Sequence, residues 1–121
     1  MKRFEDSVAW QRARTMTSEI YRVSRAGAFA KDYGLSGQMQ RAATSVMANI
    51  AEGFELFGDN QFHHALTIAK GSCGEVRSHL YVALDAGYLS QQEFDRLYAL
   101  NAEVGRLVSA LRQSVDNRRK G

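Results

Sequence analysis

The sequence predicts an all-α fold, an up-and-down antiparallel four-helix bundle that fills residues 1–121 as one domain. Three observations lead to this prediction. Apolar residues recur at spacings of three and four along four stretches, which is the mark of one buried helical face. The chain contains no proline, so nothing in it forbids long helices. No stretch alternates apolar and polar residues as a half-buried strand does.

The first helix is expected from about Asp6 to Gly27. Gly27 is its predicted C-cap, because glycine tolerates the left-handed conformation found there. Residues 28–35 are predicted to form a loop. The buried stripe of this helix is Ala9, Ala13, Met16, Ile20 and Val23.

The second helix is expected to start at Ser36 as N-cap, to run to about Glu52 and to end at Gly53. Glu52 would lie where the helix dipole disfavours negative charge. It therefore either points into water or is held by free amides of the next helix or by Arg41. The inner face would contain Met39, Ala42, Ala43, Val46 and Ile50.

The third helix is expected to be capped by Asp59 and stopped by Gly87. Gly71 and Gly74 fall inside it, where each costs about 1 kcal/mol relative to alanine. We interpret them as sites of close backbone approach by the second helix. The stripe of this helix is Phe62, Leu66, Ala69, Cys73, Val76, Leu80 and Ala83.

The fourth helix begins with a capping box over Ser90–Glu93, in which each end satisfies a free amide of the other. Asn101 lies on its core stripe, and a buried amide is costly unless it is hydrogen-bonded. We therefore predict that Asn101 is buried and bonded to a neighbouring helix. The rest of the stripe is Phe94, Leu97, Val104, Val108, Leu111 and Val115.

No catalytic residue, metal site or cofactor site is predicted. The three histidines, His63, His64 and His79, are not spaced to share an ion on one helix. Cys73, the one cysteine, lies on an apolar stripe and is expected to be an inert packing residue. A single cysteine and the lack of a membrane-length apolar run favour a cytoplasmic protein.

The basic charge is concentrated in the first half of the chain. Residues 1–50 carry eight Lys or Arg and four Asp or Glu, whereas residues 51–121 carry eight and nine. A basic half can attract phosphate, although arginines also commonly solvate outer helix faces. The candidate nucleic-acid-binding residues are Arg12, Arg14, Arg22 and Arg25, with a tail of Arg118, Arg119 and Lys120.

The segment Arg41–Gly53 carries a family resemblance, which continues through Leu66–Ser72 and Leu84–Leu89. It resembles the signature of the four-helix bundle proteins encoded within intervening sequences of bacterial large-subunit ribosomal RNA genes. With Asn101 from the core stripe, the residues that we take as a structural signature are Arg41, Asn49, Glu52, Gly53, Gly71, Ser72 and Glu75.

The resemblance implies a small cytosolic bundle that assembles as a homopentamer. The related accessory proteins of diversity-generating retroelements bind nucleic acid and a reverse transcriptase through a basic surface. Two functions therefore remain open: a nucleic-acid-associated scaffold that binds RNA or DNA, and a protein-interaction adaptor. Self-association also agrees with apolar residues left outside the four stripes, which are Trp10, Tyr21, Ile68, Tyr81 and Tyr98.

Overall fold

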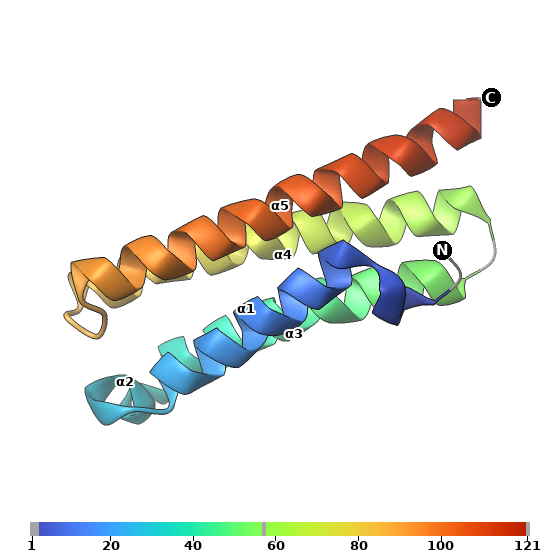
Figure 1. The fold of residues 1–121 in the computed structure, drawn as a ribbon. Coiled ribbons are helices and arrows are strands. Elements are labelled where there is room, and N and C mark those ends of the chain that lie inside the picture. The colour runs from blue at the N-terminus through green and yellow to red at the C-terminus, as the bar shows by residue number, and fades with distance from the viewer. Residues whose placement is uncertain (1–2, 57, 121) are drawn as a thin grey trace.

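The computed structural model describes residues 3–56 and 58–120, and it contains helices and no strand over those residues (Figure 1). A short 3₁₀ helix, η1, is followed by four long helices and one short one. Their bounds are η1 Phe4–Asp6, α1 Val8–Ser24, α2 Gly27–Lys31, α3 Tyr33–Glu55, α4 Asp59–Asp85 and α5 Gln91–Lys120. The predicted all-α bundle is confirmed.

The four long helices form a square in which consecutive helices are antiparallel neighbours (Figure 1). α1 packs against α3 and α5, and α4 packs against the same two, so α1 and α4 occupy opposite corners. The closing pair, α1 and α5, is also antiparallel: Arg12 lies beside Glu103 whereas Arg22, ten residues later, lies beside Glu93. No helix of the described residues is both long and apolar enough to cross a membrane.

The core follows the predicted stripes closely. Every stripe residue of the first three predicted helices is buried, and in the fourth only Leu111 is half-buried. Asn101 is buried as expected, with 4% of its surface exposed. Its Nδ2 donates to the carbonyl oxygen of Cys73 on α4 at 3.0 Å, so the predicted bond to a neighbouring helix is confirmed.

α1 is shorter at both ends than predicted. Ser7 is its N-cap, and the Ser7 hydroxyl accepts from the amide of Trp10. The helix ends at Ser24, because Ala26 is extended (φ −117°, ψ 141°) and breaks the helical path. Gly27 does adopt a left-handed φ of +57°, but it opens α2 and is not the C-cap of α1.

The predicted loop over residues 28–35 is wrong, because α2 and the start of α3 lie there. α2 places Phe29 in the core, stacked on Tyr88 at 5.2 Å. Asp32 is the N-cap of α3, with Oδ1 accepting from the amide of Leu35 at 3.1 Å. Ser36, the predicted cap, is instead buried within the helix.

Gly53 does not end the second long helix, since α3 continues to Glu55. A Cβ on Gly53 would lie 2.5 Å from Cδ1 of Phe62 on α4. Glycine is therefore needed here for close packing of two helices and not for a turn.

The turns on either side of α4 use glycines with positive φ. Gly58, at +92°, is the N-cap in place of the predicted Asp59, which is the first residue of the helix. Gly87, at +80°, follows the helix as predicted. Half of the predicted capping box is present, because the Ser90 hydroxyl accepts from the amide of Glu93 at 3.1 Å whereas the Glu93 carboxylate accepts from Arg22 and Arg96.

The close-approach interpretation of Gly71 and Gly74 is wrong. A Cβ at either position would have no neighbouring atom within 4 Å in the described structure. Gly71 lies on the exposed side of α4, and Gly74 lies at the edge of a groove between α4 and α5. Both glycines leave open space on the surface of the molecule.

Candidate nucleic-acid interface

Two of the predicted α1 arginines are held in ion pairs with carboxylates. Arg12 Nε donates to Glu103 Oε1 at 2.9 Å. Arg22 Nη2 lies 3.2 Å from Glu19 and 3.3 Å from Glu93. A guanidinium already bonded to carboxylates is less available to a phosphate, because the exchange would leave the carboxylates unpaired.

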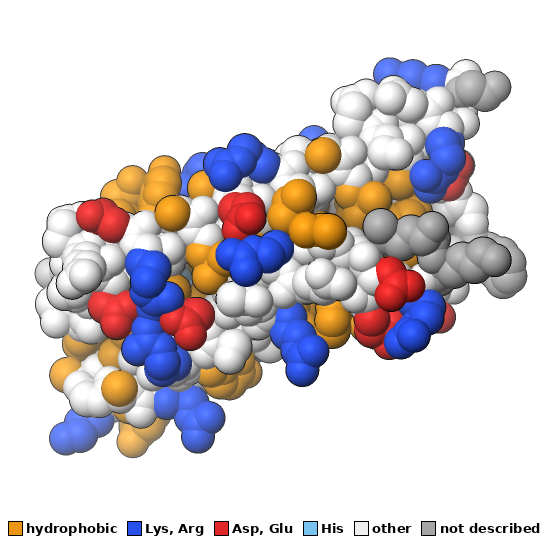
Figure 2. All heavy atoms as spheres, in the orientation of Figure 1, with side chains coloured by type: hydrophobic (Ala, Val, Ile, Leu, Met, Phe, Trp, Pro, Cys, Tyr) orange, Lys and Arg blue, Asp and Glu red, His pale blue; other side chains and the backbone are white. Residues whose placement is uncertain are grey.

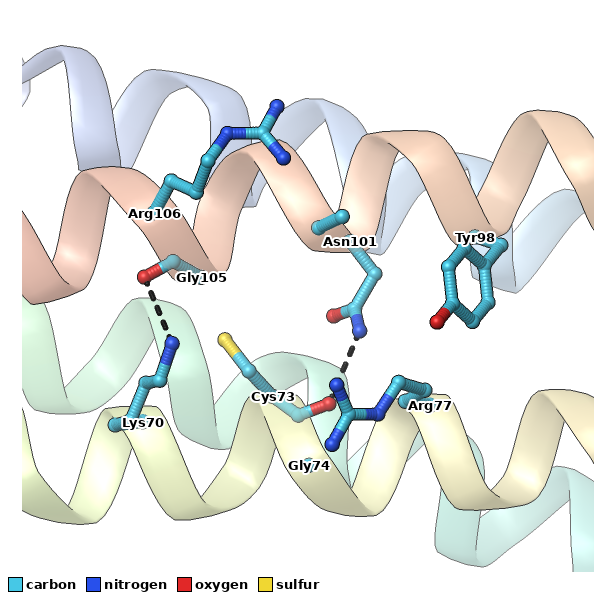
Figure 3. Close-up of a pocket in the computed structure, with 9 residues that line it drawn as sticks. Lys70, Cys73, Gly74, Arg77, Tyr98, Asn101, Gly105 and Arg106 are labelled. Carbon is cyan, nitrogen blue, oxygen red and sulfur yellow. Dashed lines mark hydrogen bonds between the residues drawn. The ribbon is translucent and has the colours of Figure 1, made fainter.

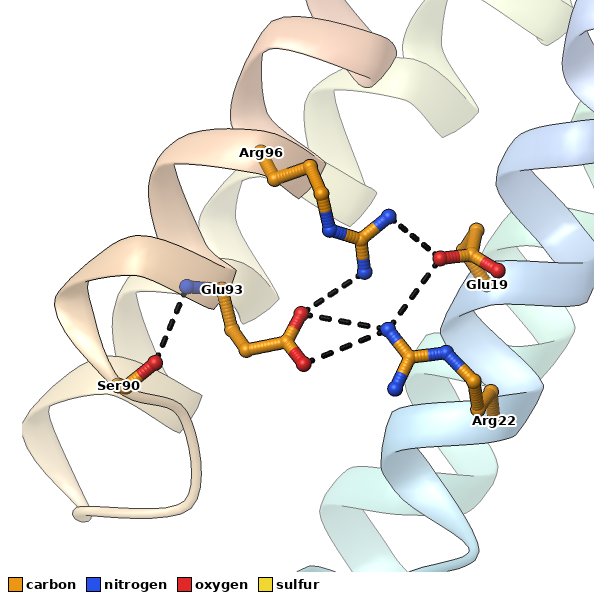
Figure 4. Close-up of polar contacts among 5 residues, drawn as sticks. All are labelled: Glu19, Arg22, Ser90, Glu93 and Arg96. Carbon is orange, nitrogen blue, oxygen red and sulfur yellow. Dashed lines mark hydrogen bonds and ion pairs between the residues drawn. The ribbon is translucent and has the colours of Figure 1, made fainter.

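Glu19, Arg22, Glu93 and Arg96 form a network that joins α1 to α5 (Figure 4). Arg96 donates to both carboxylates, and Arg22 does the same from the other helix. Hydrogen bonds from Arg22 and Arg96 lower the pKa of Glu19, and those from Arg96 and Arg22 lower the pKa of Glu93. The network therefore links α1 and α5 at the surface of the bundle.

Arg14 and Arg25 have no carboxylate partner among the described residues. The Arg14 guanidinium lies over the ring of Trp10, 5.8 Å from its centroid, and Trp10 in turn packs against Phe4. Arg25 is exposed at the end of α1. These two remain the accessible members of the predicted set on α1.

The basic tail of α5 is tied to two carboxylates, Asp59 at the start of α4 and Asp116 of α5 itself. Arg118 lies 3.1 Å from Asp59, and both Arg119 and Lys120 lie within 3.2 Å of Asp116. The hydrogen bond from Lys120 lowers the pKa of Asp116. Over the face seen in Figure 2, Lys and Arg side chains alternate with Asp and Glu and form no continuous basic patch.

A groove between α4 and α5 contains basic side chains that are not paired with carboxylates of the described residues. The residues that line this α4–α5 groove (Figure 3) include Lys70, Gly74, Arg77, Tyr98, Asn101, Gly105 and Arg106. Its volume is about 260 Å³, and no carboxylate of the described residues lines it. Neither Arg77 nor Arg106 pairs with an acidic side chain of the described residues, while Lys70 Nζ donates to the carbonyl oxygen of Gly105 at 3.2 Å.

Sequence reasoning missed these three cations. Lys70 and Arg77 are seven residues apart, so they lie on one side of α4, beside the core stripe. Arg106 comes from α5, and only the packing of the two helices brings it to the same groove. The i, i+7 spacing of Lys70 and Arg77 is the one signal that the sequence offered.

The groove floor holds an unsatisfied polar atom. Asn101 Nδ2 donates to Cys73, but Asn101 Oδ1 is buried and has no hydrogen-bond partner within the described residues. Burial raises the pKa of the Cys73 thiol to about 11, so this cysteine is a neutral packing group at neutral pH. No group of three or more His, Cys, Asp or Glu side chains is placed to hold a metal ion over residues 3–56 and 58–120.

The remaining signature residues divide between packing and solvent. The hydroxyls of Ser72 and Ser45 lie 2.8 Å apart across α3 and α4, and Asn49 donates to the carbonyl oxygen of Ser45. By contrast Arg41, Glu52 and Glu75 are exposed. Glu52 thus follows the predicted alternative in which it points into water.

The leftover apolar residues split between two parts of the bundle. Tyr81 and Tyr98 contact each other between α4 and α5, with ring centroids 6.1 Å apart. Trp10 is on α1, at the opposite corner from α4. Ile68 is exposed on α4, and Tyr21 is half-buried on α1.

Comparison with known proteins gives a consistent result. A family model described as 23S rRNA-intervening sequence protein matches residues 5–110. The chain also resembles the crystal structure of a protein of unknown function from the S23 ribosomal protein family of Bacteroides thetaiotaomicron VPI-5482, with a TM-score of 0.78 and 20% identity. The alignment covers 86% of this chain and 97% of that one, and at this identity it supports the fold alone. No match was found among curated proteins.

Proposed function

The chain belongs to the 23S rRNA-intervening sequence protein family, and on that premise we propose that it is a non-catalytic, cytoplasmic scaffold that associates with nucleic acid as a homo-oligomer. The α4–α5 groove carries the proposal. Lys70, Arg77 and Arg106 place three positive charges around one depression that no carboxylate lines. Such uncompensated charge attracts phosphate and releases counterions when a polyanion binds.

The sequence-predicted arginines contribute unequally in this proposal. Arg14 and Arg25 are free to meet a phosphate backbone. Arg12 and Arg22 are held by carboxylates and should contribute less. The tail Arg118–Lys120, at the end of α5, is also paired with carboxylates and should likewise contribute less.

Self-association is the second part of the proposal, and five subunits is the number that the family resemblance implies. The outer side of α4 supports it, because Ile68 and Val82 are 42% and 48% exposed there. Several modest basic sites on one assembly would bind a long polyanion tightly through avidity. No single subunit then needs a strong site.

The test is binding of the purified full chain to single-stranded and duplex RNA and DNA across a salt series. We expect binding that depends little on sequence and weakens steeply with salt. Replacing Arg14 and Arg25 by alanine should weaken it more than replacing Arg12 and Arg22. Undetectable binding at low salt would favour the alternative, a protein-interaction adaptor.

A further inference from the structure

We propose that the α4–α5 groove binds one nucleotide unit of a single-stranded nucleic acid, with its phosphate against Lys70, Arg77 and Arg106. This inference rests on the proposed association with nucleic acid and names the site and the form of the ligand. Its basis is the combination of three side-chain types in one place (Figure 3). They are unpaired cations, an aromatic ring and an unsatisfied buried acceptor.

The cations line the groove from two helices. Lys70 and Arg77 lie on α4, Arg106 lies on α5, and the two arginines are exposed. Lys70 is positioned by its bond to the carbonyl oxygen of Gly105. Arginine also bonds phosphate in a bidentate way, which positions the ligand as well as attracting it.

The glycines keep the groove open. Gly74 has no atom within 4 Å of the place where a Cβ would be, so any side chain there would enter open space at the edge of the groove. A Cβ on Gly105 would lie 3.4 Å from Lys70 Nζ. The resulting volume of about 260 Å³ is below the roughly 300–1,000 Å³ of pockets that enclose a whole small ligand. An open groove of this size suits one unit of a chain that passes across it.

Two features point to a base in addition to a phosphate. Asn101 is 4% exposed and lines the groove, yet its Oδ1 lacks a donor within the described structure. Nucleobases carry N–H donors, whereas a phosphodiester carries none. Tyr98 lines one end of the groove, and Tyr81 beside it is 49% exposed, which offers a surface for base stacking.

A single strand fits these features better than a duplex. The bases of a duplex are paired and stacked on one another, so they cannot turn toward Tyr81 or Asn101. The bases of a single strand are free to do so, and basic grooves with adjacent aromatic residues are the usual means of binding single strands.

The experiment measures fluorescence anisotropy of labelled oligouridylate, oligodeoxythymidylate and a mixed-sequence duplex with the full chain and its variants. The variants Arg77→Gln and Arg106→Gln should each reduce the slope of log affinity against log salt by about 0.7 for single strands. Tyr81→Leu should weaken single-strand binding by about fivefold or more. Gly74→Met should block the groove, and methionine also favours the helix more than glycine does. The matched control is Arg41→Gln, which removes a positive charge from an exposed position on α3.

Each other outcome overturns a defined part of the inference. If the wild-type chain binds nucleic acid but the groove variants behave like Arg41→Gln, the groove is not the site, although the proposed function stands. If no nucleic acid binds, the proposed function itself fails. Equal affinity for the duplex would remove the single-strand assignment. If free uridine monophosphate competes with the labelled oligonucleotide at an equal nucleotide concentration, the groove binds mononucleotides. If polyglutamate binds in the groove and oligonucleotides do not, the groove binds acidic protein segments.

Discussion

The two ends of the Asn101 amide have different surroundings. Nδ2 bonds the Cys73 carbonyl, whereas Oδ1 is buried without a partner in the described residues. An unsatisfied buried polar atom costs about 1–3 kcal/mol. Asn101 therefore connects α4 and α5 at a cost in stability, which is consistent with a role in ligand binding.

Replacing Asn101 with leucine should raise the free energy of unfolding by about 1 kcal/mol, because the unsatisfied oxygen is removed and the volume is kept. The Cys73 carbonyl retains its partner within the helix. Urea denaturation measures the change. Asn101→Ala is the control and should be destabilising, because it leaves a cavity. A clear loss of stability in Asn101→Leu would contradict the prediction.

Prediction from sequence worked for Asn101 and failed for the groove around it, for a physical reason. One helix with an apolar stripe is enough to predict that Asn101 is buried. Lys70 and Arg106 become neighbours only when two helices pack in a given register, and nothing in the spacing along one helix reports that register. Ion pairs such as Arg12–Glu103 have the same origin, which is why the α1 arginines could not be sorted into paired and unpaired ones.

Among the helices, the interiors were predicted better than the ends. Core stripes depend on many residues, whereas an end depends on one cap. Asp32 and Ser36 are both good N-cap types. Ser36 was predicted, whereas Asp32 is the N-cap. α2 has five residues, which is too short for a periodic stripe, so Phe29 was left in a predicted loop.

Substitution by alanine should change the free energy of unfolding in opposite directions at two glycines on neighbouring helices. Gly71→Ala should raise the free energy of unfolding by about 1 kcal/mol, because the site is helical, exposed and open. Gly53→Ala should lower it by about 1–3 kcal/mol, because the new methyl group would overlap Phe62. Thermal and urea unfolding of both variants measure this contrast. Equal effects at the two positions would contradict the assigned packing.

The network between α1 and α5 should contribute to stability in a pH-dependent way. Arg96→Gln should cost about 0.2–1 kcal/mol at neutral pH, the range for exposed pairs. The pKa values of Glu19 and Glu93 are lowered in the fold. Their contribution is therefore complete above the unfolded pKa, about 4.3, and is lost as pH falls through the lower folded pKa.

Denaturation at a series of pH values follows this loss. The difference between wild type and Arg96→Gln should shrink toward zero in acid. Arg41→Gln, outside the network, should show no such trend. A difference that stayed constant with pH would mean that Arg96 acts by packing alone.

At the scale of the whole molecule, the outer side of α4 exposes apolar side chains that an interface with another subunit would bury. Ile68, Gly71 and Val82 share one side of the helix by the 3.6-residue period, and the two large side chains are about half exposed. The two groove cations of α4, Lys70 and Arg77, lie on a different side of that helix, toward α5. Self-association through the outer side would thus leave the grooves free.

We expect light scattering at micromolar concentration to give a multiple of 13.5 kDa, with five copies the number implied by the family resemblance. The double variant Ile68→Glu, Val82→Glu should reduce the mass toward that of one chain, because charge repels across a packed interface. Val8→Glu, at an equally exposed position on α1, should leave the mass unchanged. The wild-type assembly should bind long single strands more tightly than short ones, because linked sites gain affinity by avidity. The dissociated variant should lose this difference. A wild-type mass of 13.5 kDa would rule out the oligomer, and a stable dimer would rule out five. If the double variant kept the wild-type mass, another face of the bundle would form the interface.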